Sequence, residues 1–195
     1  MITIKSFEYD LGYLSAGLEI LEMYLLSEEV FWPINGNPPE GEPAYPKITL
    51  DGLLLAHARL AVHRMYPSQK DQVDPIMANL EFNRSKWRVA WEKKAGQCYF
   101  ARERMWRGFL QEYQDNPQEN ADRYRYEVRL RVMLELLKSD FRRQDSSDVD
   151  LLPGLDKYLK GVLTPEGFIW EPDVQGAFPE DVYWFLYGVL PPRNR

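Results

Sequence analysis

The chain has 195 residues, of which 45% are hydrophobic, 28% charged and 14% aromatic, and its formal net charge is −6. This composition excludes a disordered chain, and the length suits a single domain, residues 1–195, with a substantial core. A single cysteine, Cys98, cannot form an intrachain disulfide, so we expect a cytoplasmic protein. The first ten residues lack the basic and apolar regions of a secretion signal, and the apolar runs are short. We therefore expect neither export nor a membrane span.

The N-terminal part predicts two helices separated by a proline-rich loop. Leucines at spacings of three and four predict a helix over residues 11–31, with Asp10 as its N-terminal cap. The segment NGNPPEGEPAYP, residues 35–46, has too many prolines for a helix or a central strand and predicts an irregular connector. A second helix is predicted over residues 50–66, and Pro67 ends it.

The central part predicts one long helix over residues 75–113, followed by an antiparallel partner. Its first residue is a proline that fits the first helical turn, and apolar residues then recur at helical spacing. Gly96 is the place where this rod would bend. A break at residues 115–117 precedes a helix predicted over residues 118–141. Short connections place consecutive helices antiparallel, so the two form a helical hairpin.

The C-terminal part predicts two short helices and little β-structure. The helices are expected over residues 151–163 and over the apolar stretch 179–187. Three strand-like stretches, residues 2–4, 47–50 and 168–170, are each too short to found a sheet alone. The sequence therefore predicts a mainly α-helical bundle built on a long antiparallel helical hairpin, with irregular proline-rich connections and at most a marginal β element.

Charge is distributed unevenly along the chain. Residues 1–51 and residues 144–190 each hold two lysines against nine acidic residues, whereas residues 84–143 hold fifteen basic residues against nine acidic ones. Either the acidic outer segments pack beside a basic central helix pair, or the basic excess binds an anion or nucleic acid. The acidic character of the whole chain favours the first interpretation.

Two arginines, Arg84 and Arg102, fall on the apolar side of the predicted long helix when residues are placed about 100° apart. A guanidinium group on such a face needs a carboxylate or another anion, because an unpaired buried charge is costly. One hypothesis is a set of structural ion pairs, and the other is a pocket for a small anion, as in an enzyme or ligand binder. The candidate structural partners are Glu19, Glu22 and Glu127.

A basic stripe with one aromatic residue lies on the opposite side of that helix. Basic side chains beside an aromatic ring are able to follow a phosphate backbone and stack a base. The alternative is a helix face that is simply solvated. The stripe, a candidate nucleic-acid-binding or partner-binding site, consists of Lys86, Lys93, Phe100, Arg104 and Arg107.

Motifs for catalysis or metal binding are absent from the sequence. His57 and His63 are six residues apart, which separates them around a helix, and there is no HExxH, GxSxG, P-loop or GxGxxG pattern. We therefore predict no catalytic residue, metal or cofactor. The six tryptophans and twelve tyrosines favour an exposed aromatic contact surface. We favour an interaction or assembly protein that binds a protein partner or itself as a homodimer, with nucleic-acid binding and anion or enzyme chemistry as alternatives.

Overall fold

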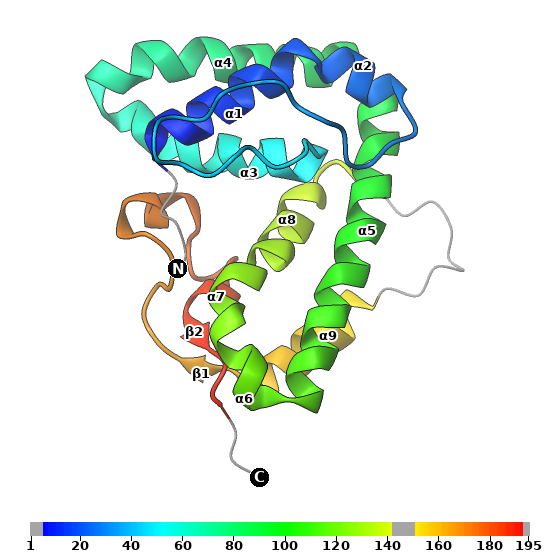
Figure 1. Cartoon of the computed structure of the whole chain (residues 1–195), viewed down its shortest axis with the longest axis vertical. Coiled ribbons are helices and arrows are strands. Elements are labelled where there is room, and N and C mark those ends of the chain that lie inside the picture. Colours follow the sequence, from blue (N-terminus) through cyan, green and yellow to red (C-terminus); the bar gives the residue numbers. More distant parts are fainter. Residues whose placement is uncertain (1–5, 142–150, 193–195) are drawn as a thin grey trace. The chain divides into compact units, whose positions relative to one another are not determined.

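The computed structural model describes residues 6–141 and 151–192 and is mainly α-helical, which confirms the predicted fold class (Figure 1). The described chain divides into two compact units: unit 1 comprises residues 6–98 and 136–141, and unit 2 comprises residues 99–135 and 151–192. The single domain predicted from the sequence stays a prediction, because compactness alone does not say whether a unit folds independently. In the described part of the chain, no helix is both long enough and apolar enough to cross a membrane.

Unit 1 contains most of the N-terminal helices, and close packing of the first against the third organises it. Gly17 lies so near the Leu53 side chain that a Cβ at this position would overlap it, so the missing side chain allows close approach. Thr49 caps the third helix by accepting a hydrogen bond from the Gly52 amide at 3.1 Å. The elements of unit 1 are α1 (Phe7–Glu19), α2 (Leu21–Leu26), α3 (Leu50–Ala61), the 3-10 helix Val62–Met65, α4 (Pro67–Lys86) and the first part of α5 (Arg88–Asp115).

The first predicted helix, residues 11–31, is wrong in its start and its length. Ser6 is the N-cap of α1, and its hydroxyl accepts a hydrogen bond from the Tyr9 amide at 3.1 Å. Asp10, the predicted cap, lies inside α1, where its Oδ2 accepts a hydrogen bond from Arg59 Nε at 2.6 Å. The helical conformation is interrupted between α1 and α2, and α2 ends well before the predicted boundary.

The single rod predicted over residues 75–113 is also wrong. The helix already begins at Pro67, so Pro75 lies in the interior of α4 rather than in a first turn. At Trp87 the backbone leaves the helical region, with φ −107° and ψ 28°, and the chain changes direction before α5 (Figure 1). The break is therefore at Trp87 and not near Gly96. Within unit 1, Gly96 instead leaves room for the Phe141 ring, which would stand 3.1 Å from an added Cβ.

Unit 2 contains a helical hairpin, as predicted, although its second arm is interrupted. The Tyr124 ring lies 6.4 Å from the rings of both Trp106 and Phe109, and Arg123 Nη1 donates to Glu112 Oε2 at 2.6 Å. These contacts join α5 to the segment that returns beside it. Within residues 118–141 the chain forms short helical pieces and not one helix: α6 (Pro117–Asn120), the 3-10 helix Ala121–Arg123, α7 (Tyr124–Glu127) and α8 (Arg129–Leu137).

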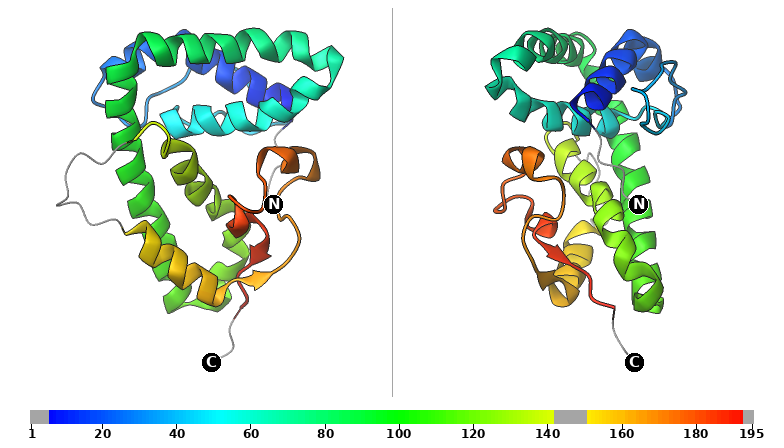
Figure 2. Two further views of the ribbon diagram at one scale, coloured as in Figure 1. Left: turned by 180° about the vertical axis from the view of Figure 1, so that it is seen from behind. Right: turned by 60° about the vertical axis from the view of Figure 1, so that its left-hand side comes forward.

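The rest of unit 2 is α9 (Leu152–Val162), close to its predicted range, and a mostly irregular C-terminal segment. The helix predicted over residues 179–187 is wrong, since only the 3-10 turn Trp184–Leu186 forms there. The strands β1 (Thr164–Pro165) and β2 (Gly188–Val189), orange and red in Figure 2, pair antiparallel and lie outside the predicted stretch 168–170. In unit 1, an isolated bridge joins Trp32 to Ile48, within the predicted stretch 47–50. The predicted stretch 2–4 lies outside the described residues.

Candidate functional site

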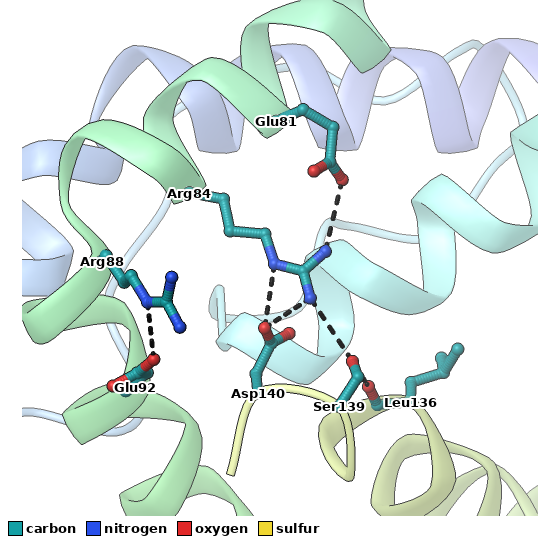
Figure 3. Close-up of polar contacts among 7 residues, drawn as sticks. All are labelled: Glu81, Arg84, Arg88, Glu92, Leu136, Ser139 and Asp140. Atoms are coloured by element: carbon teal, nitrogen blue, oxygen red, sulfur yellow. Dashed lines mark hydrogen bonds and ion pairs between the residues drawn. The ribbon is translucent and has the colours of Figure 1, made fainter.

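Arg84 lies near the end of α4 and is held by a carboxylate of unit 1. Its Nε donates to Asp140 Oδ1 at 2.8 Å, its Nη2 donates to the same oxygen, and its Nη1 lies 3.5 Å from Glu81 Oε1 (Figure 3). Ser139 Oγ is 3.4 Å from Nη2. Asp140 is buried, so solvent screens this pair only weakly. An anionic ligand at Arg84 would have to displace a protein carboxylate, and that carboxylate is none of the three considered from the sequence.

Arg102, the second arginine of the anion-pocket hypothesis, is a buried residue of unit 2. Its Nη1 lies 3.4 Å from Met105 Sδ. Burial lowers the pKa of Arg129, and the charge of Arg102 lowers it further, although Tyr126 and Glu127 act in the opposite direction. Arg84 and Arg102 therefore belong to different units and have different surroundings.

The residues of the basic stripe are divided between the two units as well. In unit 1, Lys86 Nζ lies 3.8 Å from Glu22 Oε2, and Lys93 Nζ donates to Glu28 Oε1 at 2.8 Å. Both lysines thus have acidic neighbours from the N-terminal region. In unit 2, Arg104 and Arg107 are exposed, and the half-buried Phe100 ring meets the Tyr99 ring edge-on at 6.1 Å.

Four large apolar side chains of unit 1 are exposed on α2, near the end of α4 and at the start of α5, and these three segments lie close together (Figure 1). The exposed fractions are 58% for Met23, 59% for Leu26, 64% for Phe82 and 83% for Val89. We call these four residues the junction patch. Large apolar side chains gathered in this way differ from single exposed ones, which are ordinary on a protein surface.

The ion pairs of Lys86 and Lys93 show that the residues of the junction patch lie on adjoining helix faces. Side chains four residues apart share one face of a helix, so Leu26 lies beside Glu22, Phe82 beside Lys86, and Val89 beside Lys93. Because Glu22 is near Lys86 and Glu28 contacts Lys93, these helix faces adjoin one another. The hydrogen bond and the charge of Lys93 lower the pKa of the Glu28 carboxyl. The apolar side chains of the junction patch therefore lie among these ion-paired side chains.

Charged side chains of both signs surround the junction patch, and those on α1 and α2 are acidic. No lysine or arginine occurs between residues 6 and 46, so the side formed by α1 and α2 is acidic. We call its exposed acids, Glu19, Glu22, Glu28 and Glu29, the acidic edge. The end of α4 and the start of α5 adjoin the acidic edge through the Glu22–Lys86 and Glu28–Lys93 pairs and carry both signs of charge, including the exposed carboxylates of Glu81 and Glu92. We call the exposed bases of this segment, Lys86, Arg88 and Lys93, the basic edge, within which Arg88 Nε also donates to Glu92 Oε1 at 3.0 Å.

A buried polar network holds the end of α2 in place. Tyr24 is fully buried, and its hydroxyl accepts a hydrogen bond from the Leu50 amide at 3.0 Å, donates to Val30 O at 3.1 Å and lies 3.4 Å from Cys98 Sγ. Tyr24 thereby joins α2 to α3 and α5. The segment that carries Met23 and Leu26 is consequently anchored by hydrogen bonds that are shielded from water.

Lys94, in the first half of α5, extends this network and is only 1% exposed. Its Nζ donates to Ser27 O at 2.7 Å and to Glu29 O at 2.9 Å, and it lies 4.6 Å from the centre of the Tyr24 ring. Burial lowers the pKa of this lysine. Lys94 thus donates hydrogen bonds to the backbone carbonyl groups of Ser27 and Glu29, just after α2. These bonds hold the backbone of the segment that carries Glu28 and Glu29.

The thiol of Cys98 predicts slow alkylation of the folded protein. Burial, and then the nearby charge of Asp51, raises its pKa from 9.0 to about 12. At pH 8 the thiolate fraction is consequently about a thousandfold smaller than for a free thiol. We expect iodoacetamide to modify Cys98 rapidly only in urea, as followed by mass spectrometry. Rapid alkylation of the folded chain would contradict the buried position.

The raised pKa of Cys98 also makes the free energy of unfolding fall at alkaline pH. The folded chain keeps its Cys98 proton up to a pH of about 12, whereas the unfolded chain loses it near pH 9. The contribution of this thiol to stability is therefore complete below pH 9 and falls as the pH rises above that value.

The histidines do not gather with other ligand residues. Burial lowers the pKa of His57, and a nitrogen of the His63 ring, Nδ1, lies 2.9 Å from Gln69 Oε1. Among residues 6–141 and 151–192, no group of three His, Cys, Asp or Glu side chains is placed to hold a metal ion. The predicted lack of a metal and of a cofactor stays a prediction.

Comparison of the chain with protein-family models, curated proteins and solved structures found no match. The site must therefore be argued from geometry. The sequence contains a signal for the exposure of Met23 and Leu26, because both lie off the row of leucines that predicts the first helix. It contains no signal that α2 lies close to Val89, since that depends on how distant segments pack.

Proposed function

We propose that this protein is a non-catalytic interaction or assembly protein that binds a protein partner through the junction patch. The exposure of four large apolar side chains on adjoining helix faces of unit 1 is the observation that carries the proposal. An apolar centre with a polar rim is the usual composition of a protein–protein contact. Met23 and Leu26 are among the flexible and branched side chains that fill a partner's surface well.

The anchored framework supports the same function. Binding costs less conformational entropy when the contact residues are already held in place. Tyr24 and Lys94 hold the end of α2 through buried hydrogen bonds, so the patch needs little rearrangement on contact. We also propose a cytoplasmic location, because the single cysteine suits a reducing compartment.

The two alternative functions, nucleic-acid binding and the binding of a small anion, have less support. A phosphate backbone along Lys86 and Lys93 would lie beside the carboxylates of Glu22 and Glu28, which repel it. A small anion at Arg84 would compete with Asp140. A protein surface, in contrast, is able to carry both signs of charge and to match both edges.

Site-specific photocrosslinking in cells that produce the full chain tests the proposal. A photoreactive amino acid in place of Leu26 is expected to give discrete protein adducts, because this side chain would be covered by the partner. The matched control has the same photoreactive residue in place of Gln72, an exposed residue of α4 that lies about 15 Å along the helix from Phe82. Absence of adducts at position 26, or equal adducts at both positions, would overturn the proposed function.

A further inference from the structure

We propose that residues 42–47, at the end of the proline-rich connector, are the docking site of a partner domain that recognises polyproline II segments. We call these six residues, with the sequence EPAYPK, the proline ridge; they belong to unit 1. The groove of the partner would be lined by aromatic side chains and would carry a carboxylate for Lys47. This proposal goes beyond the function proposed for the junction patch and does not depend on it.

The two prolines favour a polyproline II conformation over the proline ridge. The rings of Pro43 and Pro46 fix φ at about −65°, and each ring pushes the residue before it toward an extended conformation. Residues 43–47 form neither a helix nor a strand. A polyproline II helix has three residues per turn, so side chains three positions apart lie along the same edge of the ridge.

The exposure of the side chains repeats every three residues, as a polyproline II conformation requires. The edge formed by Glu42 and Tyr45 is half-buried. The other two edges are exposed, and they consist of Pro43 with Pro46 and of Ala44 with Lys47. The ridge therefore presents two of its three edges to a partner.

The half-buried edge holds the proline ridge against α1. The centre of the Tyr45 ring lies 4.9 Å from that of Tyr9 and 5.7 Å from that of Tyr13. The Ser6 amide donates a hydrogen bond to Glu42 Oε1 at 3.1 Å. The protein's own helix thus occupies the third edge and leaves the other two uncovered.

Backbone contacts fix the proline ridge as well. The amide of Trp32 donates to Ile48 O at 3.1 Å, and the amide of Ile48 donates to Trp32 O at 2.8 Å, so the connector is closed directly after the ridge. The Tyr9 hydroxyl donates to Ala44 O at 3.4 Å. A partner therefore meets a segment whose conformation is already set, which lowers the entropic cost of binding.

The chemistry of the exposed edges indicates the kind of partner. Grooves that bind polyproline II segments are lined by aromatic rings, against which proline rings pack. A groove covers two edges of such a helix, and two are the number that α1 leaves exposed. Lys47 is the only lysine or arginine between residues 6 and 58, so a carboxylate in the groove would fix the direction of the ridge. A phosphate backbone fits less well, because Glu40 and Glu42 precede the prolines.

Biolayer interferometry of the full-length chain against a panel of purified SH3, WW and EVH1 domains tests the proposal. At least one domain is expected to bind the wild-type chain. Replacing Pro43 and Pro46 together by alanine is expected to weaken this binding about tenfold, because the ring contacts and the fixed φ angles are lost. Lys47→Glu is expected to weaken it as well, through repulsion by the groove carboxylate.

Pro33→Ala is the matched control, because Pro33 is an exposed proline of unit 1 that lies outside the proline ridge. This variant is expected to bind like the wild type. Circular dichroism checks that every variant is folded, so that a loss of binding is not a loss of structure.

Three outcomes overturn the proposal: no domain of the panel binds, the double proline variant or Lys47→Glu binds as tightly as the wild type, or Pro33→Ala weakens binding equally. The photocrosslinking result at Leu26 is independent of all three. Adducts at Leu26 without binding to the panel would leave the junction patch in place and remove only the proline ridge. Binding to the panel without adducts at Leu26 would do the reverse.

Discussion

Replacing Arg131 by methionine is expected to lower the free energy of unfolding by about 3 kcal/mol. Arg131 is 2% exposed, and its Nε and Nη2 donate to the two carboxylate oxygens of Asp156 at 2.8 and 2.9 Å, while Nη1 donates to Glu135 at 2.9 Å. Methionine would fill most of the space over the Phe185 ring but would remove the cation that faces two half-buried carboxylates. Urea denaturation followed by circular dichroism measures the loss.

Burial alone would lower the pKa of Arg131, but the hydrogen bonds and charges of Asp156 and Glu135 raise it. The attraction between Arg131 and the two carboxylates therefore exceeds the cost of burying the charge. For this reason, we expect the loss of the arginine to lower stability substantially. Arg123→Met is the matched control, since Arg123 also binds a carboxylate, that of Glu112, but lies on the surface. We expect a loss of less than about 1 kcal/mol there. Equal losses in the two variants would show that burial does not strengthen the Arg131 contacts.

Replacing Tyr24 by phenylalanine is expected to cost about 3 kcal/mol, although only one oxygen atom is removed. The buried Leu50 amide would lose its acceptor, and Val30 O would lose a donor. Each buried polar group left without a partner costs about 1–3 kcal/mol, while the change in shape is negligible. The midpoint of urea unfolding measures the effect.

Tyr66→Phe provides the control for Tyr24→Phe, because Tyr66 is an exposed residue and its hydroxyl is hydrated in both states. A change within about 0.5 kcal/mol is expected there. If Tyr24→Phe is as harmless as Tyr66→Phe, the network does not anchor α2, and the preorganisation argument for the junction patch fails.

Local patterns in the sequence predicted the helical class and most element locations. The proline-rich connector of residues 35–46 and α9 lie where expected, because proline and hydrophobic periodicity act over a few residues. The hairpin of unit 2 followed from the short break at residues 115–117. The same reasoning was wrong for residues 179–187, which it predicted to be a helix. The aromatic residues of the C-terminal segment pack in an irregular conformation, with the Trp170 and Phe178 rings edge-on at 5.3 Å.

The candidate site was only partly predictable. The five stripe residues and the two arginines were identified from the sequence as candidate binding residues, but their neighbours were not. Arg84 meets Asp140, which lies 56 residues away, and neither helical spacing nor charge counting selects that carboxylate among the others. The junction patch was missed because the stripe was taken to be one face of a single continuous helix, whereas that helix breaks at Trp87, and Lys86 and Lys93 pair with acids of the N-terminal region.

The sequence by itself determined that this chain is helical, where its prolines interrupt it, and that its termini are acidic around a basic centre. These properties depend on neighbours within one or two helical turns or on composition alone. The tertiary structure decided that Lys94 is buried while Val89 on the same helix is exposed, and that Glu28 of the N-terminal region pairs with Lys93. Burial and ion pairing depend on which distant segments meet, and many arrangements of the same helices satisfy the local preferences equally well.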